Sequence, residues 1–290
     1  MVPSRSRTKT QLIVLPPRGL AVPGVFRNID FNPSRRERLL AEMQRFRGGV
    51  YAADGAIQPS DLTADGRHKL SADEDSWHVL SLDAAGGVCA CIRYLEETHA
   101  VGFDDLWVRQ AVLAQCPSLG RKFRLAVEGE MGRARDIGVA FGEVGGWAVA
   151  PEHRWTVEPL RMILATYGLL ELLGGCVGVA TATFRHGSAT ILRRIGLQSL
   201  SLDGEPLPPY YDPHYGCPME VLRFDSRFPS PKYHGWVQEL GKSLADAVVI
   251  PAEARVAPQP GLWPMPDSPA ANGNWYPRLA EGWEHAQLEV

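Results

Sequence analysis

The chain lacks the cysteine spacings that indicate a disulfide framework or a zinc site. It has five cysteines without a C-x-x-C pair, namely Cys89, Cys91, Cys116, Cys176 and Cys217. An odd count without such pairs predicts a reduced, cytoplasmic protein. The C-x-C pair has no third and fourth ligand nearby in the sequence, so we interpret both thiols as small core residues and expect no bound metal.

The chain also lacks a long apolar run. No segment reaches the roughly 18 unbroken apolar residues that cross a bilayer, and no signal-type apolar core follows the basic N-terminus. We therefore expect no transmembrane segment. The absence of a G-x-S-x-G motif disfavours a Ser-His-Asp hydrolase.

Excess charge of one sign is missing too, since the formal net charge is only -3. This balance gives no reason to expect a nucleic-acid partner. The charge is unevenly spread, because residues 1 to 47 hold ten Lys or Arg and three Asp or Glu, whereas residues 51 to 83 hold two and seven. A basic segment beside an acidic one fits the docking of an acidic protein, and it also fits a merely solvated surface.

The most informative stretch runs from Phe141 to Leu197. It contains an apolar run of strand length, a polar loop, a helix-length apolar segment, a second apolar strand and a short helix. This order predicts a β-α-β-α unit whose first loop lies at the carboxyl edge of a sheet, where helix N–H groups can meet an anion. Thr156 is expected to cap the first helix, with Glu158 in its first turn.

This unit resembles the second half of the GNAT N-acyltransferase fold. Val149-Ala150-Pro151-Glu152-His153-Arg154 matches the V-x-P-E-x-R pattern at the end of the family's fourth strand, and Ser188 to Leu197 loosely matches its A-x-x-L-Y-x-x-x-G-F segment. The resemblance implies an α/β fold with a mixed, partly splayed central sheet flanked by helices. It also implies that the loop and helix after the strand bind the pyrophosphate or pantetheine arm of a thioester donor.

Two departures from the family pattern stand out. The family's phosphate loop usually reads R-x-x-G-x-G, but Arg154 is followed by Trp155, Thr156, Val157 and Glu158. Without the two glycines, the backbone loses its close approach to a CoA pyrophosphate. The tyrosine that many acetyltransferases use as general acid falls at Leu192, which cannot serve.

Within the fold, the chain is most similar to the N-acyl amino acid synthases and the acyl-homoserine lactone synthases. Their E-x-S-R-x-A-V strand resembles residues 143 to 149, with Gly145 and Gly146 in place of serine and arginine. Their first half resembles Asp73-Glu74-Asp75 followed by two strands, the second with Arg93 near its end. Many of these enzymes take the acyl chain from acyl carrier protein, whose phosphopantetheine carries no nucleotide.

We expect three parts along the chain: a basic arm at 1–32, a GNAT-like acyltransferase domain at 33–249 and a Pro/Trp-rich tail at 250–290. The tail is expected to wrap the body or a partner subunit, which allows an oligomer. The domain's first helix should start at Ser34 and stop at Gly48-Gly49.

Two loops are expected near the substrates. Residues 52 to 72 show no periodicity and are interpreted as a substrate-covering loop. The stretch Leu207 to Tyr215 resembles a Y-x-P-x-Y loop beside the active site of the N-acyl amino acid synthases, and it is equally consistent with a rigid surface turn.

The resemblance assigns roles on the acceptor side. Amide formation from a thioester needs a neutral amine, a group that takes its proton and donors for the oxyanion. Glu143 is expected to be the base or acceptor anchor, Arg93 to bind the acceptor carboxylate, and Asp75 and His78 to contact the ammonium or relay the proton. Arg93 near the end of its strand is costly to bury unpaired, so we expect it to pair with a carboxylate, with Glu143 and Glu128 as the candidates. Such a pair either orients the acceptor or is purely structural.

On the donor side, the backbone N–H groups of Gly145, Gly146 and Trp147 are expected to hold the oxyanion. The residues expected to bind the donor are Trp147, Val149, Arg154 and Thr156. His186, beside a helix start, is expected to act as a capping residue. No cofactor is expected to bind tightly, because acyl-phosphopantetheine on acyl carrier protein or CoA is a co-substrate.

The sequence thus predicts an N-acyltransferase that moves a medium or long acyl chain, donated by acyl carrier protein, to the amine of an amino acid or amino-acid-like acceptor. Three alternatives stay open: an acyl-homoserine lactone synthase that uses S-adenosylmethionine, an acyl-CoA-dependent acetyltransferase, and a non-catalytic GNAT-like binding module.

Overall fold

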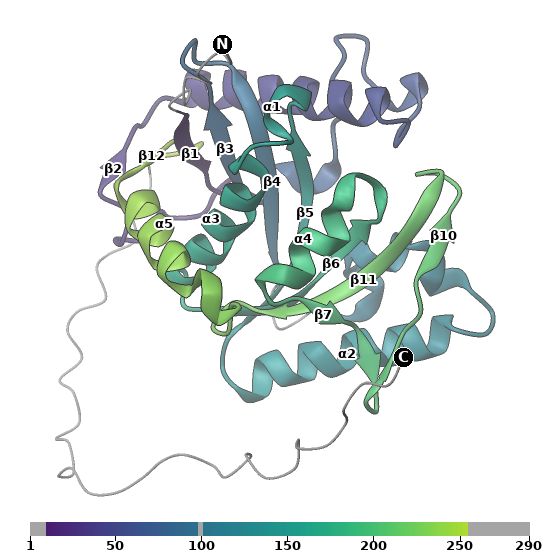
Figure 1. The fold of residues 1–290 in the computed structure, drawn as a ribbon. Helices are drawn as coiled ribbons and strands as arrows, with labels where there is room; N and C mark the ends of the chain where they lie inside the picture. Colours follow the sequence, from purple (N-terminus) through teal and green to yellow (C-terminus); the bar gives the residue numbers. More distant parts are fainter. Residues whose placement is uncertain (1–9, 98–100, 255–290) are drawn as a thin grey trace, which may run out of the picture. The chain divides into compact units, whose positions relative to one another are not determined.

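A mixed ten-stranded sheet organises the chain in the computed structural model, which describes residues 10–97 and 101–254 (Figure 1). Most of the predicted tail and residues 1–9 of the predicted arm lie outside these residues. The strand order is β10-β11-β6-β5-β4-β3-β1-β12-β2, and β7 pairs with β11. The strands are β1 Gln11–Leu15, β2 Asn28–Ile29, β3 Trp77–Leu82, β4 Val88–Glu97, β5 Ala140–Val149, β6 Cys176–Thr183, β7 Gln198–Ser199, β10 Tyr210–Asp212, β11 Cys217–Asp225 and β12 Val248–Val249.

Within the described residues, five α-helices flank the sheet, with α3, α4 and α5 on one face and α1 and α2 on the other (Figure 1). Strand β3 shows why both faces are covered: all six of its residues are buried. Val79 packs on the α3 side and its neighbour Leu80 on the α1 side, as the two-residue period of a strand requires. The helices are α1 Pro33–Ala53, α2 Gly120–Asp136, α3 Glu158–Leu172, α4 Ser188–Ile195 and α5 His234–Asp246.

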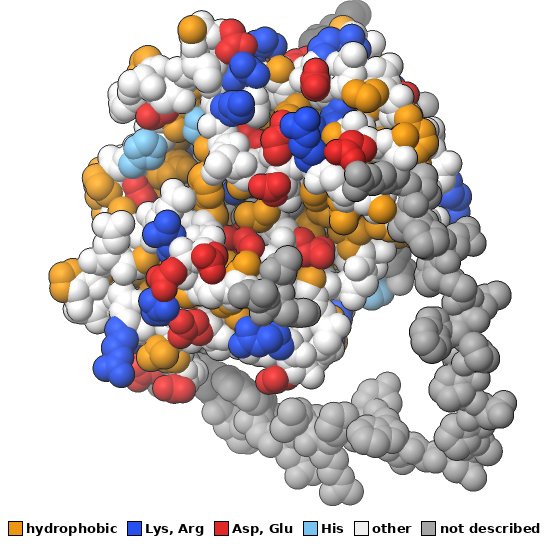
Figure 2. Space-filling model, turned by 180° about the vertical axis from the view of Figure 1, so that it is seen from behind, with side chains coloured by type: hydrophobic (Ala, Val, Ile, Leu, Met, Phe, Trp, Pro, Cys, Tyr) orange, Lys and Arg blue, Asp and Glu red, His pale blue; other side chains and the backbone are white. Residues whose placement is uncertain are grey.

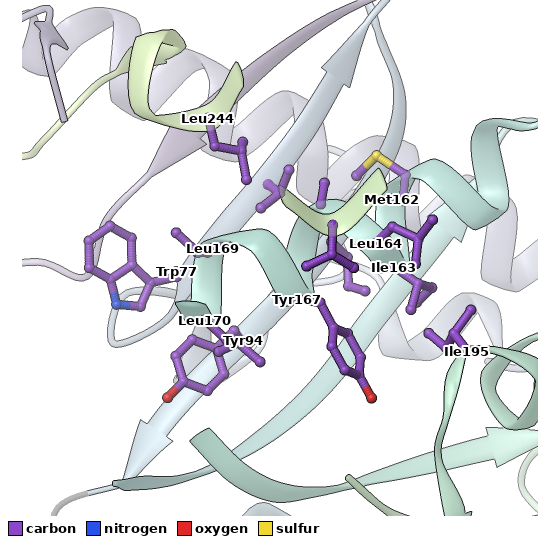
Figure 3. Packing of buried hydrophobic residues seen from close by; sticks show 14 of the residues in the cluster. Trp77, Tyr94, Met162, Ile163, Leu164, Tyr167, Leu169, Leu170, Ile195 and Leu244 are labelled. Atoms are coloured by element: carbon purple, nitrogen blue, oxygen red, sulfur yellow. The ribbon is translucent and has the colours of Figure 1, made fainter. Parts of the chain in front are cut away.

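The face under α3 holds the largest hydrophobic cluster. Tyr167, Leu169 and Leu170 of α3 pack with Trp77 of β3 and Tyr94 of β4 (Figure 3). Apolar side chains on nearly every position of α3 make it a buried helix, and the parallel β5-α3-β6 crossover is the unit that the sequence predicts. The predicted α/β class, with a mixed sheet flanked by helices, is confirmed.

The predicted bounds of α1 are wrong at both ends. Asn32 caps the helix, because its side chain accepts a hydrogen bond from Arg35 N at 2.9 Å. The helix continues through Gly48-Gly49 to Ala53. Gly48 is required for packing, since a Cβ there would lie 2.9 Å from Leu62 Cδ2 and 3.1 Å from His68 N.

A buried ion pair holds α1 against the loop that precedes β3. Arg47 Nη1 and Nη2 donate to Asp73 Oδ1 and Oδ2 at 2.9 and 2.8 Å, and the two side chains are 0% and 1% exposed. Gln44 Nε2 and Leu70 N also donate to Asp73. Burial by itself would raise the pKa of Asp73, but the hydrogen bonds and charge of Arg47 lower it to about 2.

We expect Asp73→Asn to lower the free energy of unfolding by about 3–5 kcal/mol, because it leaves the Arg47 guanidinium buried without a counter-charge. Asp75→Asn is the matched control, since Asp75 is exposed two residues away and should change stability by less than about 0.5 kcal/mol. Urea unfolding measures both. Equal effects of the two substitutions would contradict the structural role of the Arg47–Asp73 pair.

Candidate active site

The sheet opens between its two central strands. Strands β5 and β6 pair in parallel only from Ala140↔Cys176 to Val144↔Ala180, although β5 runs on to Val149 and β6 to Thr183. Beyond that point β5 stays with β4 and β6 stays with β11. The partly splayed sheet implied by the family resemblance is therefore present, and it leaves unpaired strand edges facing each other.

A bulge in β5 lies inside the open part. Cys91 pairs with Ala148 and Arg93 with Gly145, so Gly146 and Trp147 together oppose Ile92. Gly146 has φ +62°, a left-handed conformation that residues with a Cβ rarely adopt. A Cβ there would also lie 3.2 Å from Arg93 Cβ. Glycine is thus the residue that this bulge requires.

A pocket occupies the opening and is lined from both faces of the sheet. Tyr51 of α1 borders it on one side, and Ile163 of α3 and Leu192 of α4 border it on the other. Most of its wall is apolar or small. The charged or titratable exceptions, apart from tyrosine and cysteine, are Asp54, Arg154, Arg185 and His186 among the residues described.

Arg93 lies buried beside the two glycines of the pocket wall. A Cβ added at Gly145 would lie 3.7 Å from Arg93 Nη2, and the Arg93 side chain is 3% exposed in all. Its guanidinium lies over the Trp107 ring at 5.2 Å, while Nε and Nη1 have no hydrogen-bond partner. The predicted ion pair of Arg93 with Glu143 or Glu128 is absent among the described residues, so that prediction is wrong. Burial lowers the pKa of Arg93.

Glu143 lies deeper, on the same face of the sheet, and is absent from the pocket wall. Both carboxylate oxygens accept backbone hydrogen bonds, from Trp107 N and Val108 N at 2.6 Å each, and the residue is 5% exposed. Burial raises its pKa against these hydrogen bonds. Its catalytic role stays a prediction, and its visible contacts fix the turn at Trp107–Gln110.

Glu97 lies next to Glu143, and the two carboxyl groups interact. Burial, followed by the charge of Glu143 and a hydrogen bond with it, raises the pKa of Glu97 to about 7. The backbone N–H groups of Trp107 and Val108 act in the opposite direction on Glu143, because they stabilise its charged form.

The structure separates the other predicted site residues. Trp147, Val149 and Arg154 line the pocket, whereas Asp75, His78 and Thr156 do not. His78 is fully buried with Nε2 2.7 Å from Asp73 O, and burial lowers its pKa to about 4. The Thr156 hydroxyl donates to His153 O and accepts from Glu158 N, two residues before α3 begins. Asp75 is exposed.

Sequence reasoning missed several residues of the pocket wall, among them Tyr51, Asp54, Arg185 and Tyr215. Tyr51 Oη donates to Trp147 O at 3.3 Å. Burial raises the pKa of both tyrosines, so both are protonated at neutral pH. Tyr215 belongs to the predicted aromatic loop, and that loop was the one signal in the sequence that could have identified it as a pocket residue. No such signal marks Tyr51 or Asp54.

Figure 2 shows one face of the molecule, on which Lys and Arg side chains lie among Asp and Glu. The described part of this face carries no patch of a single charge sign. None of the helices in the described ranges is long and apolar enough to span a membrane.

No family model matches the sequence, and no curated protein is similar to it. Solved structures match the fold. BjaI, a CoA-dependent acyl-homoserine lactone synthase with SAM and isopentyl-CoA, has a TM-score of 0.52 at 14% identity, over 86% of this chain and 96% of that chain. FeeM, an N-acyl amino acid synthase from uncultured soil microbes, has a TM-score of 0.43 at 12% identity, over 76% and 92%. The likeness to BjaI confirms the predicted GNAT-like fold.

We expect the stability difference between the wild type and Glu97→Gln to fall as pH rises from 5 to 8. A carboxyl whose pKa is raised in the folded state stabilises below its ordinary pKa and loses that contribution as pH rises through about 7. Gln keeps a neutral hydrogen-bonding group at this position. Urea unfolding at several pH values measures the difference, and exposed Glu96→Gln is the control. A stability difference that does not change with pH would contradict the raised pKa of Glu97.

Proposed function

We propose that the protein is an N-acyltransferase that moves a medium or long acyl chain from a phosphopantetheine thioester, presented by acyl carrier protein, to the amine of an amino acid or amino-acid-like acceptor. The observation that carries this proposal is the opening between β5 and β6, with a glycine bulge on one edge and an apolar pocket passing between the strands.

The opening suits a pantetheine arm. Past Val144 and Ala180, the facing edges of β5 and β6 do not pair with each other, and backbone polar groups require partners. The two amides of an extended pantetheine can supply them as an added strand would. The thioester carbonyl then reaches the bulge at Gly145-Gly146, whose N–H groups are the proposed oxyanion donors. Ile163 and Leu192 provide apolar surface for the acyl chain.

Arg93 supports an acceptor that carries a carboxylate. A buried guanidinium with unpartnered Nε and Nη1 is costly. A carboxylate that enters beside Gly145 would accept from Nη2, which lies 3.7 Å from a Cβ added there, together with either Nε or Nη1, in the paired geometry that arginine and carboxylates adopt. An amino acid bound in this way brings its amine toward the thioester.

The proton of the acceptor amine needs a base. Glu143 is the proposed base or anchor, because burial raises its pKa toward the working range of a general base. A water relay is required, since its oxygens face the Trp107 turn. Protonated Tyr215 can donate a hydrogen bond to the acceptor or to the leaving thiol, whereas the Tyr51 hydroxyl donates to Trp147 O.

An acyl-homoserine lactone synthase is the second candidate, favoured by the fold likeness to BjaI. S-adenosylmethionine is itself an amino acid with a free amine and carboxylate, so Arg93 suits it by the same chemistry. The product distinguishes the two functions, because the lactone loses the carboxylate that an N-acyl amino acid keeps.

We expect new amides when the protein is incubated with acyl carrier protein thioesters, pooled amino acids and S-adenosylmethionine. Mass spectrometry identifies the acceptor and separates an acyl amino acid from a lactone. Gly146→Ala should lower the rate by about 10²-fold or more through misplacement of the bulge. Gly138→Ala is the matched control, with φ +69° and no atom within 4 Å of its added Cβ. Absence of amides from every acceptor would overturn the proposed activity.

We expect Arg93→Met to raise the KM for an amino-acid acceptor by about 10- to 100-fold, as loss of a charged hydrogen-bonding partner predicts. The KM for the thioester should stay within about threefold. An amine without a carboxylate separates binding from structure, because its turnover should not change. Equal losses with both acceptors would contradict carboxylate recognition by Arg93. Arg124→Met, at an exposed arginine on α2, is the control.

A further inference from the structure

The charged end of the pocket is closed by one carboxylate. Asp54, directly after α1, accepts from Arg154 Nη1 and Nη2 at 2.9 and 2.8 Å, a two-pronged ion pair across 100 residues of sequence. His186 Nε2 lies 3.3 Å from Asp54 Oδ1. Arg185 Nη1 donates to the Asp54 carbonyl oxygen. Both arginines that line the pocket are therefore directed at one acidic residue.

A second carboxylate occupies the start of α3. Glu158 lies in the first turn, is buried, and accepts from Arg161 Nη1 at 3.1 Å on each oxygen. A negative charge there already meets the positive end of the helix dipole. The preceding residues contain no glycine for close backbone approach, and Trp155 is 88% exposed. Asp54 and Glu158 thus reach the same loop from its two ends.

We propose that Asp54, supported by Glu158, selects the donor by charge. This inference rests on the proposed acyl transfer and names the donor class within it: a pantetheine that ends in one phosphodiester, and not a nucleotide donor such as acyl-CoA. With Asp54 paired to Arg154, Arg185 supplies one unbalanced positive charge, which a single phosphodiester neutralises. The additional phosphates of CoA would lie against the Asp54 carboxylate, and like charges at close range oppose binding.

Three small thioester donors separate this selection from protein docking: S-acyl-pantetheine, the methyl phosphodiester of S-acyl-phosphopantetheine and acyl-CoA of the same chain length. The methyl ester gives the phosphopantetheine used in both assays the single charge of the carrier-protein arm. For the wild type, we expect kcat/KM to be highest with acyl-phosphopantetheine. Asp54→Asn should raise kcat/KM for acyl-CoA by about tenfold or more relative to acyl-phosphopantetheine. Acyl-pantetheine, which lacks phosphate, measures any effect of Asp54→Asn that does not depend on donor charge, and the change with acyl-CoA is counted relative to it.

Binding of CoA and of phosphopantetheine, measured by calorimetry, tests the selection without turnover. Asp54→Asn should tighten CoA more than phosphopantetheine, and Glu158→Gln should act in the same direction. Asp246→Asn removes one negative charge from the surface pair with Arg27 and controls for net charge. If circular dichroism shows that Asp54→Asn is not folded, Asp54→Ser replaces it in both assays.

The outcomes of the two assays are distinct. If no donor gives an amide but Asp54→Asn still tightens CoA selectively, the acyl-transfer proposal fails and the charge selection stands. If amides form but the CoA to phosphopantetheine ratio does not move, the selection is overturned. Weaker binding of both ligands in Asp54→Asn would also overturn it, because Asp54 would then only position Arg154.

Discussion

The loss of hydrogen bonding between β5 and β6 after Val144 and Ala180 is the constraint on which the rest of the structure depends. Two parallel strands in a sheet interior normally pair along their whole length, because unpaired backbone groups are costly away from water. Here the strands diverge while each keeps its outer neighbour. The polar edges that remain are tolerable only where solvent or a ligand reaches them, and the pocket lies there.

The buried charges on the α1 face keep that wall in place. Arg47 and Asp73 join α1 to the loop before β3, and Arg47 Nη1 would lie only 3.4 Å from a Cβ at Gly146. Arg93 occupies the next position, between Gly145 and the Trp107 turn that Glu143 holds. The bulge is therefore backed by two cations: Asp73 fixes Arg47, and the Trp107 ring, on the turn that Glu143 holds, lies against Arg93. Such a support is rigid, as a site that orients two substrates requires.

The opposite end of the pocket has different chemistry. Asp54, Arg154, Arg185 and His186 come from three separate segments that meet where β5 and β6 end. An apolar slot with charge at one end and a glycine bulge farther in matches a ligand that is charged at one end and reactive at the other. The proposals on donor and acceptor both follow from this polarity of the pocket.

The sequence by itself determined the longer strands, the β5-α3-β6 crossover and the loop that carries Arg154, because their signals are local: apolar period, glycine stops and a short motif. It placed Trp147, Val149 and Arg154 at the pocket for the same reason. Only the tertiary structure decided that α1 continues through Gly48, that Arg93 has no carboxylate partner in the described chain, and that Asp54 forms an ion pair with Arg154. Each of these features depends on a contact between residues that are far apart in the chain: a loop backbone beside Gly48, an aromatic ring over Arg93, and the end of α1 beside Arg154. A local sequence pattern does not contain such contacts.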